Sequence, residues 1–388
     1  MAQERKKITF FISSFRAGGG EGAMIDIANA LSRRNYNISF LAFVSIGEYY
    51  SRVDKNIKIT AFNSRRMLLS LPKIVFYLRK EKPDLVITVD EHASIYILIA
   101  KKIAGVQTRI ILRVGTTYSR LFSVYKGIKN KSLPYFIRWL YKYADGVIAV
   151  SKGIADDIIS VASLMPERVV TIYNPKQLNL IKEQMSEKIE HPWIENKEIP
   201  IIITAGRFRV PKNYELLIRA FAIISKNIPS RLIIVGKGRD GEKLKDLVTM
   251  LNCGDKVSFP GFTDNPYAWM SKADIFVLPS LWEGMPNALL EAMACGIAVI
   301  SSDCSSGPRE ILAPNTDYRF RLKEGVEYAQ YGVLTAVNDE KSLVQAMTKL
   351  LTDNELRAKY ASLSSDRIKD FDSNKIIDEY AHALGLIN

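Results

Sequence analysis

The sequence predicts an α/β fold built from two doubly wound, parallel-sheet domains. Short apolar segments alternate with longer segments of helical pattern along the chain, and this alternation indicates βαβ units and parallel sheets. It occurs in two series of about equal size, and 388 residues suffice for two domains of about 100–200 residues each. We expect strands at residues 8–13, 38–43, 85–89, 109–114 and 146–150 in the first series, and at 201–205, 231–235, 256–259, 275–278 and 298–301 in the second.

The division between the two series predicts an N-terminal domain over residues 1–178 and a C-terminal domain over residues 179–369. The segment 174–200 is rich in Lys, Glu and Asn and contains three prolines, which is typical of a linker combined with a polar helix. Residues 366–388 have a helical pattern, for which Asp372 or Ser373 is a suitable cap.

Composition narrows the class of protein and its compartment. No apolar run approaches the roughly 18–20 residues that a membrane-spanning helix requires. The apolar run after the basic N-terminus is too short for a secretory signal and fits a first buried strand. The three cysteines, Cys253, Cys295 and Cys304, lack metal-ligand spacing, so we expect them to be reduced and structural. These features predict a cytoplasmic protein without a metal site.

The positive charge is concentrated in the first half of the chain. Residues 1–176 contain 28 Lys and Arg against 13 Asp and Glu, a net charge of +15. The remaining residues contain 26 against 28, a net charge of −2, so the whole +13 belongs to the first half. This asymmetry favours an anionic partner for that half, either a nucleic acid or an anionic membrane surface.

Gly18-Gly19-Gly20-Glu21-Gly22 follows the first predicted strand and opens a helix expected at residues 23–32. Glycines there allow the backbone to approach a ligand closely, and a helix N-terminus offers free N–H groups to a phosphate. A flexible strand-to-helix turn is the alternative interpretation, because glycine-rich first turns are common in this architecture.

Gly206-Arg207-Phe208-Arg209-Val210-Pro211-Lys212-Asn213 follows the first strand of the second series and precedes a helix. Arg207 can bind a diphosphate through two parallel hydrogen bonds, and Lys212 adds a point charge. Without a metal, these cations would stabilise the charge on a departing nucleotide diphosphate. A solvated basic loop is the alternative interpretation.

Glu283-Gly284-Met285-Pro286-Asn287-Ala288-Leu289-Leu290-Glu291 follows a strand that ends in Leu-Pro-Ser. Pro286 suits the first turn of a helix, so Glu283 lies just outside that helix and Glu291 about two turns inside it. One carboxylate can then face a sugar while the other reaches a ribose diol, and the free N–H groups at the helix start can face phosphate. Surface charge is the usual explanation for a lone pair of glutamates.

The spacing of Glu283 and Glu291, within Pro-Ser-Leu-Trp-Glu-Gly-Met-Pro-Asn-Ala-Leu-Leu-Glu-Ala-Met-Ala-Cys-Gly, resembles the signature of family 4 glycosyltransferases. The glycine-rich first loop, the Gly-Arg…Lys-Asn segment, Phe259-Pro-Gly-Phe262 and Gly307-Pro-Arg-Glu310 match that family in order. The resemblance implies the GT-B fold, two Rossmann-like domains facing across a cleft. It also implies that a closing helix at about 370–388 packs back on the N-terminal domain.

The resemblance further implies a retaining, metal-independent transfer from a nucleotide sugar, without a cofactor. The donor nucleotide would be UDP, the commonest in the family, or GDP. The donor would bind the C-terminal domain and the acceptor the N-terminal domain, with closure excluding water. By position, the resemblance implies that Arg207 and Lys212 bind the diphosphate, with the amides of Asn287 and Ala288 facing the phosphates. It implies that Glu283 contacts the transferred sugar and that Glu291 binds the ribose. Gly261 and Phe262 would lie near the base, and the backbone of Gly19 and Gly20 would approach the donor.

One stretch departs from the family pattern. Many members have a His close to the reaction centre after the strand at 109–114, whereas this chain has Gly115-Thr116-Thr117-Tyr118 there. Arg113 is one candidate for the acceptor side in its place. His92, at the carboxyl end of the preceding strand, is the other, although a structural histidine is an equal alternative.

Two further motifs suggest other chemistry. Gly236-Lys237-Gly238-Arg239-Asp240-Gly241 fits the G-x-G-x-x-G of dinucleotide-binding domains, but it follows the second strand of its series, so we interpret it as a false positive. Asp370-Phe371-Asp372 resembles the Asp-x-Asp of metal-dependent transferases, but it lies at the polar start of a helix. We expect neither NAD nor a metal ion.

Basic and apolar residues are mixed in two stretches of the first half, 65–80 and 120–142. Aromatic and aliphatic groups beside cations suit an anionic lipid surface, and amphipathic helices packed on the sheet are the alternative. We therefore predict peripheral contact with the inner face of the cytoplasmic membrane, which fits a lipid-linked acceptor. The residues concerned are Arg65, Arg66, Met67, Leu68, Leu69, Leu71, Phe76, Tyr77, Leu78, Arg79, Lys80, Tyr125, Lys126, Lys129, Lys131, Tyr135, Phe136, Arg138, Trp139 and Tyr141.

The sequence thus predicts a glycosyltransferase that moves a hexose or N-acetylhexosamine to a hydroxyl of a lipid-linked or glycan acceptor in polysaccharide or glycoconjugate synthesis. A nucleotide-sugar epimerase of related fold is an alternative that would form product without an acceptor. A basic nucleic-acid-binding protein is a second alternative, but it leaves Glu283 and Glu291 unexplained, and we expect no nucleic-acid partner. A nicotinamide-dependent oxidoreductase is a third alternative, and it rests only on Gly236, Gly238 and Gly241.

Overall fold

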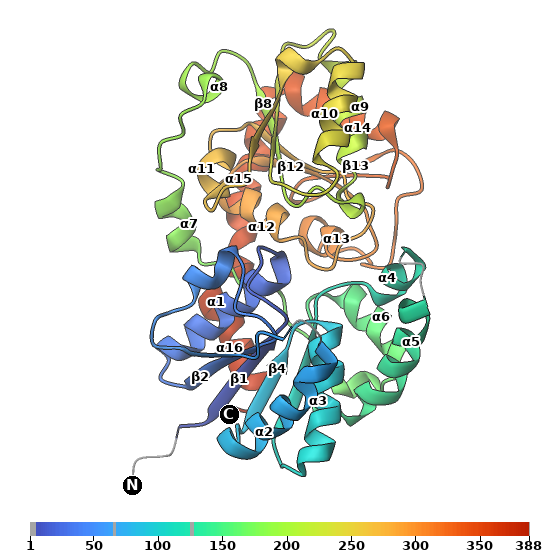
Figure 1. The fold of residues 1–388 in the computed structure, drawn as a ribbon. Coiled ribbons are helices and arrows are strands. Elements are labelled where there is room, and N and C mark those ends of the chain that lie inside the picture. The colour runs from blue at the N-terminus through green and yellow to red at the C-terminus, as the bar shows by residue number, and fades with distance from the viewer. Residues whose placement is uncertain (1–4, 65–66, 125–127, 388) are drawn as a thin grey trace. The chain divides into compact units, whose positions relative to one another are not determined.

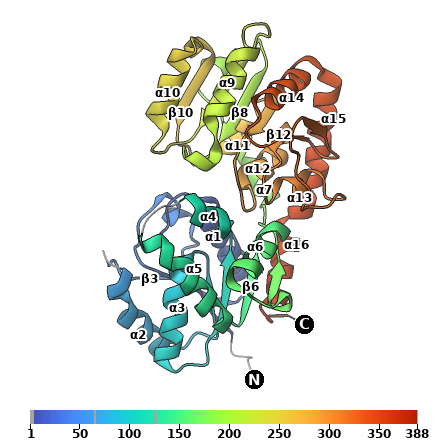
Figure 2. The same cartoon turned by 90° about the vertical axis from the view of Figure 1, so that its right-hand side faces the viewer.

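The computed structural model describes residues 5–64, 67–124 and 128–387, and the chain forms two compact units (Figures 1 and 2). The first unit consists of Met1–Pro175 together with Ser373–Asn388, and the second consists of Lys176–Asp372. The boundary thus lies at Pro175, where we expected residue 178, and the last residues of the chain belong to the first unit.

A seven-stranded parallel sheet forms the centre of the first unit, in the order β3-β2-β1-β4-β5-β6-β7. The chain winds outward from β1 in one direction and then from β4 in the other, so the sheet is doubly wound. Its strands are β1 (Lys7–Ile12), β2 (Asn37–Ala42), β3 (Lys58–Ala61), β4 (Leu85–Thr88), β5 (Arg109–Val114), β6 (Gly146–Ala149) and β7 (Val169–Thr171).

Helices cover both faces of this sheet, so alternate residues of its inner strands are buried on opposite sides. Phe10 packs in the core with residues of α1 and α16, whereas the hydroxyl of Thr9, its neighbour, lies 3.0 Å from that of Tyr77 on α2. The helices are α1 (Gly19–Arg33), α2 (Leu71–Glu81), α3 (Glu91–Ala104), α4 (Tyr118–Val124), α5 (Ile128–Leu140), α6 (Lys152–Ala162) and α16 (Ser373–Ala383).

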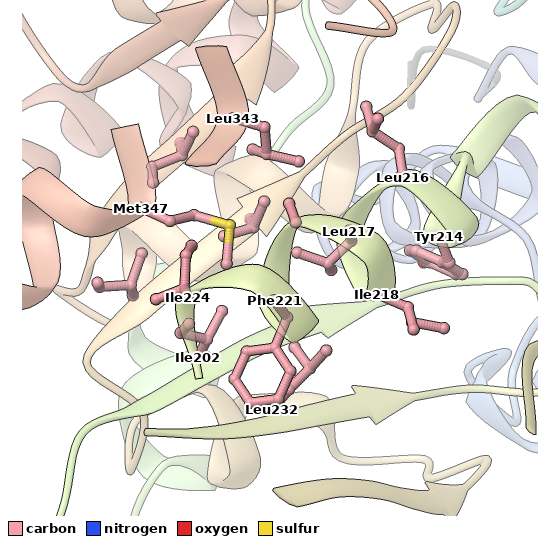
Figure 3. Packing of buried hydrophobic residues seen from close by; sticks show 14 of the residues in the cluster. Ile202, Tyr214, Leu216, Leu217, Ile218, Phe221, Ile224, Leu232, Leu343 and Met347 are labelled. Carbon is pink, nitrogen blue, oxygen red and sulfur yellow. The ribbon is translucent and has the colours of Figure 1, made fainter. Parts of the chain in front are cut away.

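The second unit repeats this plan with the order β10-β9-β8-β11-β12-β14-β13, in which only β13 runs antiparallel to its neighbour among the described strands. On one face, α9 and α14 pack on β8, β9 and β11 through side chains such as Phe221, Ile224 and Met347 (Figure 3). The strands are β8 (Ile201–Ala205), β9 (Arg231–Val235), β10 (Val257–Gly261), β11 (Ile275–Leu278), β12 (Ala298–Ser302), β13 (Val326–Tyr328) and β14 (Val333–Thr335).

The remaining helices of the second unit complete its two layers. Helices α12 and α15 pack on β12, on the opposite face from α9 and α14. The helices are α7 (Leu178–Gln184), α8 (Pro192–Glu195), α9 (Tyr214–Ile224), α10 (Gly241–Met250), α11 (Pro266–Met270), α12 (Asn287–Ala294), α13 (Pro308–Leu312), α14 (Glu340–Thr352) and α15 (Asn354–Arg367). Both units have the doubly wound fold that the sequence predicts.

The structure differs from the sequence prediction in three places. Strands β3, β7, β13 and β14 were not predicted, because three of them have only three residues and β3 is partly exposed. Helix α1 begins at Gly19, four residues earlier than expected, so the glycines form its first turn. The helix expected at 366–388 is interrupted, because α15 ends at Arg367 and α16 begins at Ser373, where the chain re-enters the first unit.

Candidate active site

Two loops of the second unit leave its sheet side by side. Strands β8 and β11 are neighbours at the point where the strand order reverses, and the loops 206–213 and 279–286 follow them. Ligands of doubly wound sheets bind outside the carboxyl ends of the strands at this point. The amide of Leu281 donates to the carbonyl of Pro211 at 2.8 Å, which joins the two loops. The fold therefore brings together the two motifs that the sequence singled out separately.

Lys212 and Glu283 form an ion pair at this junction. The distance from Lys212 Nζ to Glu283 Oε1 is 2.6 Å, and the hydroxyl of Ser280 donates to the same oxygen at 2.6 Å. The side chains are 22% and 11% exposed, so the pair is largely shielded yet reachable from solvent. The sequence had assigned Lys212 to the diphosphate and Glu283 to the sugar, and it gave no role to Ser280. A ligand phosphate at Lys212 would therefore lie beside the Glu283 carboxylate.

The side chain of Arg207 is accessible to a ligand. Its side chain is exposed and has no hydrogen bond or ion pair with any residue that the structure describes. The backbone just before it is closely packed, because a Cβ on Gly206 would lie 2.7 Å from the hydroxyl of Tyr214. Burial raises the pKa of Tyr214, so this tyrosine stays neutral beneath the loop.

Helix α12 presents its N-terminus at the same junction. Asn287 and Ala288 are its first two residues, and the amides of Leu289 and Leu290 already bond to the carbonyl of Pro286. The first N–H groups of a helix have no partner within that helix and carry the positive end of its dipole. The arrangement suits a phosphate, and the phosphate-facing role of Asn287 and Ala288 stays a prediction.

The segment after β12 supports the loop that carries Glu283. Ser306 Oγ donates to the carbonyl of Gly284 at 2.8 Å, and Gly307 adopts φ +89 against Pro286. A Cβ on Gly307 would lie 2.5 Å from Pro286 Cδ and 2.9 Å from Gly284 O, so only glycine fits without a shift. The Gly-Pro-Arg-Glu part of the family resemblance therefore includes a packing requirement of this loop.

Glu291 lies one turn further along α12 and is paired with a residue that the sequence analysis missed. Lys176 Nζ lies 2.9 Å from Glu291 Oε1, and the two side chains are 8% and 19% exposed. Lys176 is 115 positions away in the chain and belongs to no motif. No signal in a single sequence distinguishes it from the other lysines of the linker segment.

Gly261 and Phe262, expected near the base, are the last residue of β10 and the residue after it, at the same edge of the sheet. Gly261 adopts φ +90, and its carbonyl accepts from the amide of Gly236 at 2.8 Å. The Phe262 ring is partly exposed and has Lys237 Nζ 4.5 Å from its centre. A flat ring beside a cation offers a surface on which a nucleobase can stack.

The G-x-G-x-x-G segment is explained by contact between two loops. A Cβ on Gly236 would lie 2.0 Å from Gly206 O, and one on Gly238 would lie 2.3 Å from Phe208 O. The amide of Phe208 donates to the carbonyl of Lys237 at 3.0 Å. Glycines occur here because the loop after β9 lies directly against the backbone of the loop after β8, and this packing accounts for the pattern without a dinucleotide.

Gly238→Ala tests this explanation. We expect a loss of about 1–3 kcal/mol in unfolding free energy, because the added methyl group overlaps the Phe208 backbone. Gly254→Ala is the matched control, since a Cβ there meets nothing within 4 Å. Urea unfolding followed by circular dichroism measures both. Equal stability of the two variants would contradict the packing explanation.

In the first unit, Gly19 and Gly20 open α1 at the carboxyl edge of β1, which neighbours β4 where that strand order reverses. Gly18 caps the helix with an extended φ of −170 and without a side-chain hydrogen bond. Such a glycine start is compatible with the anion-binding role expected for Gly19 and Gly20. That role stays a prediction.

His92 is an exposed residue in the first turn of α3, after Asp90. Asp90 caps this helix through a 2.8 Å hydrogen bond from the amide of Ala93, and its other oxygen accepts from the amide of Ser13 at 3.1 Å. Desolvation by burial raises the pKa of Asp90. His92 therefore lies at the carboxyl edge of the sheet, where a ligand can reach it, and its acceptor role stays a prediction.

Arg113, the other acceptor-side candidate, is only 1% exposed. Its Nε donates to the hydroxyl of Tyr380 on α16 at 2.9 Å, and its Nη2 donates to Asn174 Oδ1 at 2.5 Å. Nη1 is buried without a partner among the described residues. These contacts give Arg113 a packing role that joins β5 to α16, in contrast to the accessible position expected for an acceptor ligand.

The next features concern metal ligation, thiol reactivity and membrane-spanning length in residues 5–64, 67–124 and 128–387. No cluster of His, Cys, Asp or Glu in these ranges could hold a metal ion, and Asp370 pairs with Arg367 at 2.6 Å. Burial raises the pKa of the Cys295 and Cys304 thiols to about 12, so both are unreactive at neutral pH. No helix in these ranges has the length and hydropathy to cross a membrane.

The first unit contains a cavity of about 730 Å³. It is lined by residues in or next to β5, β6, β7 and α16, among them Arg109, Arg168 and His382. The two arginines already donate to backbone carbonyls, of Leu384 and of Lys142 and Ala144 respectively. This cavity contains none of the predicted site residues.

Family models match both halves of the chain. Residues 17–178 match the model described as Glycosyltransferase Family 4, and residues 185–364 match Glycosyl transferases group 1. The first match lies in the first unit apart from its last three residues, and the second lies within the second unit.

Named relatives and solved structures agree with these matches. N-acetylgalactosamine-N,N'-diacetylbacillosaminyl-diphospho-undecaprenol 4-alpha-N-acetylgalactosaminyltransferase of Campylobacter jejuni is 32% identical over 293 residues, or 75% of this chain and 73% of that protein. A second transferase of that organism, which adds N-acetylgalactosamine to a diphospho-undecaprenol-linked glycan, is 26% identical over 97% of this chain and 99% of its own. HepE of Anabaena in complex with UDP-glucose superposes with a TM-score of 0.80 at 21% identity, covering 98% and 100%. The chain is a glycosyltransferase with the GT-B fold and belongs to glycosyltransferase family 4.

Proposed function

We propose that this protein transfers a hexose or N-acetylhexosamine from a UDP-sugar to a hydroxyl of a lipid-linked glycan, with retention of anomeric configuration and without a metal ion. The observation that carries the proposal is the Lys212–Glu283 pair at the N-terminus of α12. The pair lies where doubly wound sheets bind their ligands, and it combines a cation for the diphosphate with a carboxylate for the sugar.

In this proposal, different residues along one edge of the sheet in the second unit bind the diphosphate and the sugar of the donor. Arg207, Lys212 and the first amides of α12 stabilise the diphosphate as it departs with negative charge. Glu283 accepts hydrogen bonds from the hydroxyls of the transferred sugar, and Ser280 keeps its carboxylate in place. These cations and amides are fixed before the reaction, so they need little reorganisation as negative charge develops on the diphosphate. They would therefore stabilise that charge in place of a divalent metal ion.

The acceptor proposal is supported by the relatives. Both Campylobacter jejuni transferases have acceptors named as diphospho-undecaprenol-linked sugars, and one matches this chain over almost its full length. A polyprenyl chain stays in the membrane, so an enzyme acting on its glycan works at the membrane surface. Such a lipid-linked acceptor fits the basic character of residues 1–176.

Exposed aromatic and aliphatic side chains on the first unit support contact with that surface. They lie on α2 and α5 and on the short helices Met67–Ser70 and Tyr141–Tyr143. Lys80 lies over the ring of Phe76, and Lys142 lies over that of Tyr143. The exposed side chains are Leu68 (70%), Leu69 (63%), Phe76 (65%), Tyr135 (76%), Phe136 (47%), Trp139 (52%) and Tyr143 (50%).

Part of the predicted membrane-contact stretches is packed, and part lies outside the description. Tyr77, Leu78 and Tyr141 are buried against the sheet, as the alternative interpretation held for some positions. Arg65, Arg66, Tyr125 and Lys126 lie outside the described residues, as do the side chains of Met67, Lys129 and Lys131.

We expect the double variant Phe76→Ser, Trp139→Ser to lose vesicle binding several-fold. Both side chains are exposed, so their removal takes away insertion into lipid but little packing. The measurement is co-sedimentation at low salt with vesicles of phosphatidylglycerol and phosphatidylcholine in equal parts. Met250→Ser is the control, because Met250 is 65% exposed on the second unit. Unchanged sedimentation of the double variant would contradict membrane contact through these helices.

Product analysis tests the reaction itself. Purified protein is incubated with UDP-sugars, with and without a diphospho-undecaprenol-linked oligosaccharide, and the products are resolved by chromatography and NMR. The proposal predicts a new α-linked sugar only when the acceptor is present, since the relatives' linkages are named as alpha. Epimerised donor formed without acceptor would favour the epimerase alternative and overturn transfer.

A further inference from the structure

The backbone of Lys176 is held by contacts at the end of the second unit. Lys176 is the first residue of that unit, it is 6% exposed, and its amide donates to the carbonyl of Phe371 at 2.8 Å. Its backbone also forms a parallel bridge with Asp372, the last residue of the unit. The two points where the chain enters and leaves the unit therefore hold this lysine in place.

The ammonium group of Lys176 is directed at one oxygen of Glu291. Nζ lies 2.9 Å from Oε1, whereas Oε2 accepts no hydrogen bond from the residues that the structure describes. A buried ammonium is costly unless it is paired, and Glu291 supplies that pair. The result is a carboxylate with one oxygen held and the other open.

The position of Glu291 along α12 suits a nucleotide. Glu291 is the fifth residue of the helix that begins at Asn287, so it lies on the order of 6 Å from the helix start along the axis. A phosphate at the first amides of α12 would place the ribose of the same nucleotide one turn further along. The open oxygen of Glu291 then meets the two hydroxyls of the ribose.

We propose that Lys176 is a positioning residue for ribose recognition, which holds Glu291 so that its open oxygen accepts hydrogen bonds from the 2′- and 3′-hydroxyls. The proposal rests on the proposed use of a nucleotide sugar, and it assigns the preference for ribose to a residue outside the family motifs. Lys176 touches neither the sugar nor the diphosphate, so it acts on donor affinity and leaves the transfer step unaffected.

Binding of matched nucleotides tests the proposal. Calorimetry compares UDP with 2′,3′-dideoxyuridine diphosphate, and GDP with its dideoxy counterpart, for wild type, Lys176→Met, Lys176→Arg and Glu291→Gln. Wild type should prefer the ribonucleotide by about 10- to 100-fold, the range for hydrogen bonds to a charged group. Lys176→Met and Glu291→Gln should each reduce this preference to a few-fold, and their combination should reduce it no further. Lys176→Arg should retain most of it.

The control is Lys197→Met, which removes another paired lysine of the same unit. Lys197 lies 2.9 Å from Asp274, and the two side chains are 34% and 21% exposed. Its loss should leave the ribose preference unchanged. In turnover assays, Lys176→Met should raise KM for the donor about tenfold while kcat stays within about twofold, since only binding is affected.

The outcomes separate this inference from the proposed function. If Lys176→Met weakens both nucleotides equally and keeps their ratio, the lysine is merely structural and the inference is wrong. A wild type that binds UDP or GDP without preference for ribose would also overturn the inference, while the transferase proposal stands. A wild type that binds neither nucleotide overturns both.

Discussion

Glu283→Gln is expected to lower kcat by about 10²- to 10³-fold, the effect of removing one preorganised electrostatic group from an active site. Glutamine keeps the shape of the side chain and one oxygen that can accept from Ser280, but it removes the negative charge that pairs with Lys212. UDP should still bind, because the α12 amides and Arg207 are untouched. The measurement is turnover with saturating donor, together with calorimetry for UDP.

Glu242→Gln is the control for this experiment. Its side chain is 86% exposed on α10, and its carboxylate pairs with the surface Lys245. We expect unchanged turnover, because exposed pairs contribute little. Normal turnover of Glu283→Gln beside the control would contradict the site assignment, whereas loss of UDP binding would move Glu283 from sugar contact to nucleotide binding.

Arg309→Met is expected to reduce the unfolding free energy of the protein by about 3–5 kcal/mol, because it leaves a buried carboxylate without its cation. Asp303 is fully buried and accepts from Arg309 through both oxygens, at 3.1 Å and 2.7 Å, and Glu327 lies 2.7 Å from the same guanidinium. Arg309 lies in the first turn of α13, two residues after Gly307. The network therefore also anchors the segment that supports the Glu283 loop.

Urea unfolding measures this effect, with Lys349→Met as the control. Lys349 pairs with Asp353 at 2.9 Å, but the side chains are 48% and 31% exposed, so we expect a change of about 0–1 kcal/mol. Adding Asp303→Asn to Arg309→Met should restore part of the loss, since the orphaned charge is removed. Equal stability of Arg309→Met and Lys349→Met would contradict the account of this network.

Most of the sheet could be predicted from the sequence, because buried parallel strands are apolar at most positions. The strand predicted at 201–205 matches β8, and that at 275–278 matches β11. The strands that escaped prediction, such as β7 and β13, are three residues long and partly exposed, so neither length nor burial marks them. A run of apolar residues indicates a buried strand, whereas a short edge strand buries few side chains and therefore has no such run.

The candidate site was predicted in its parts but not in its pairings. Lys212 and Glu283 were each found through a motif, yet their 2.6 Å contact spans 71 positions of the chain. Lys176 belongs to no motif, and it became a candidate because it pairs with Glu291, 115 positions away. Such contacts depend on which loops the strand order places side by side, and no local pattern records that order.

The glycine pattern at 236–241 shows the opposite case, in which a motif exists without the chemistry that usually explains it. Gly236 and Gly238 are required by the approach of Gly206 and Phe208. The sequence shows that glycine is needed, but only the structure shows whether a ligand or another loop lies against it.

The central claim is that the loops after β8 and β11 bind a nucleoside diphosphate, and thermal unfolding with UDP, GDP or NAD tests it most directly. A ligand at 100 times its dissociation constant adds about 2.7 kcal/mol, which should raise the midpoint by a few degrees. We predict a rise with UDP for wild type and a smaller rise for Lys212→Met at the same UDP concentration. A rise with NAD alone, or an equal rise with UDP in both proteins, would contradict the claim.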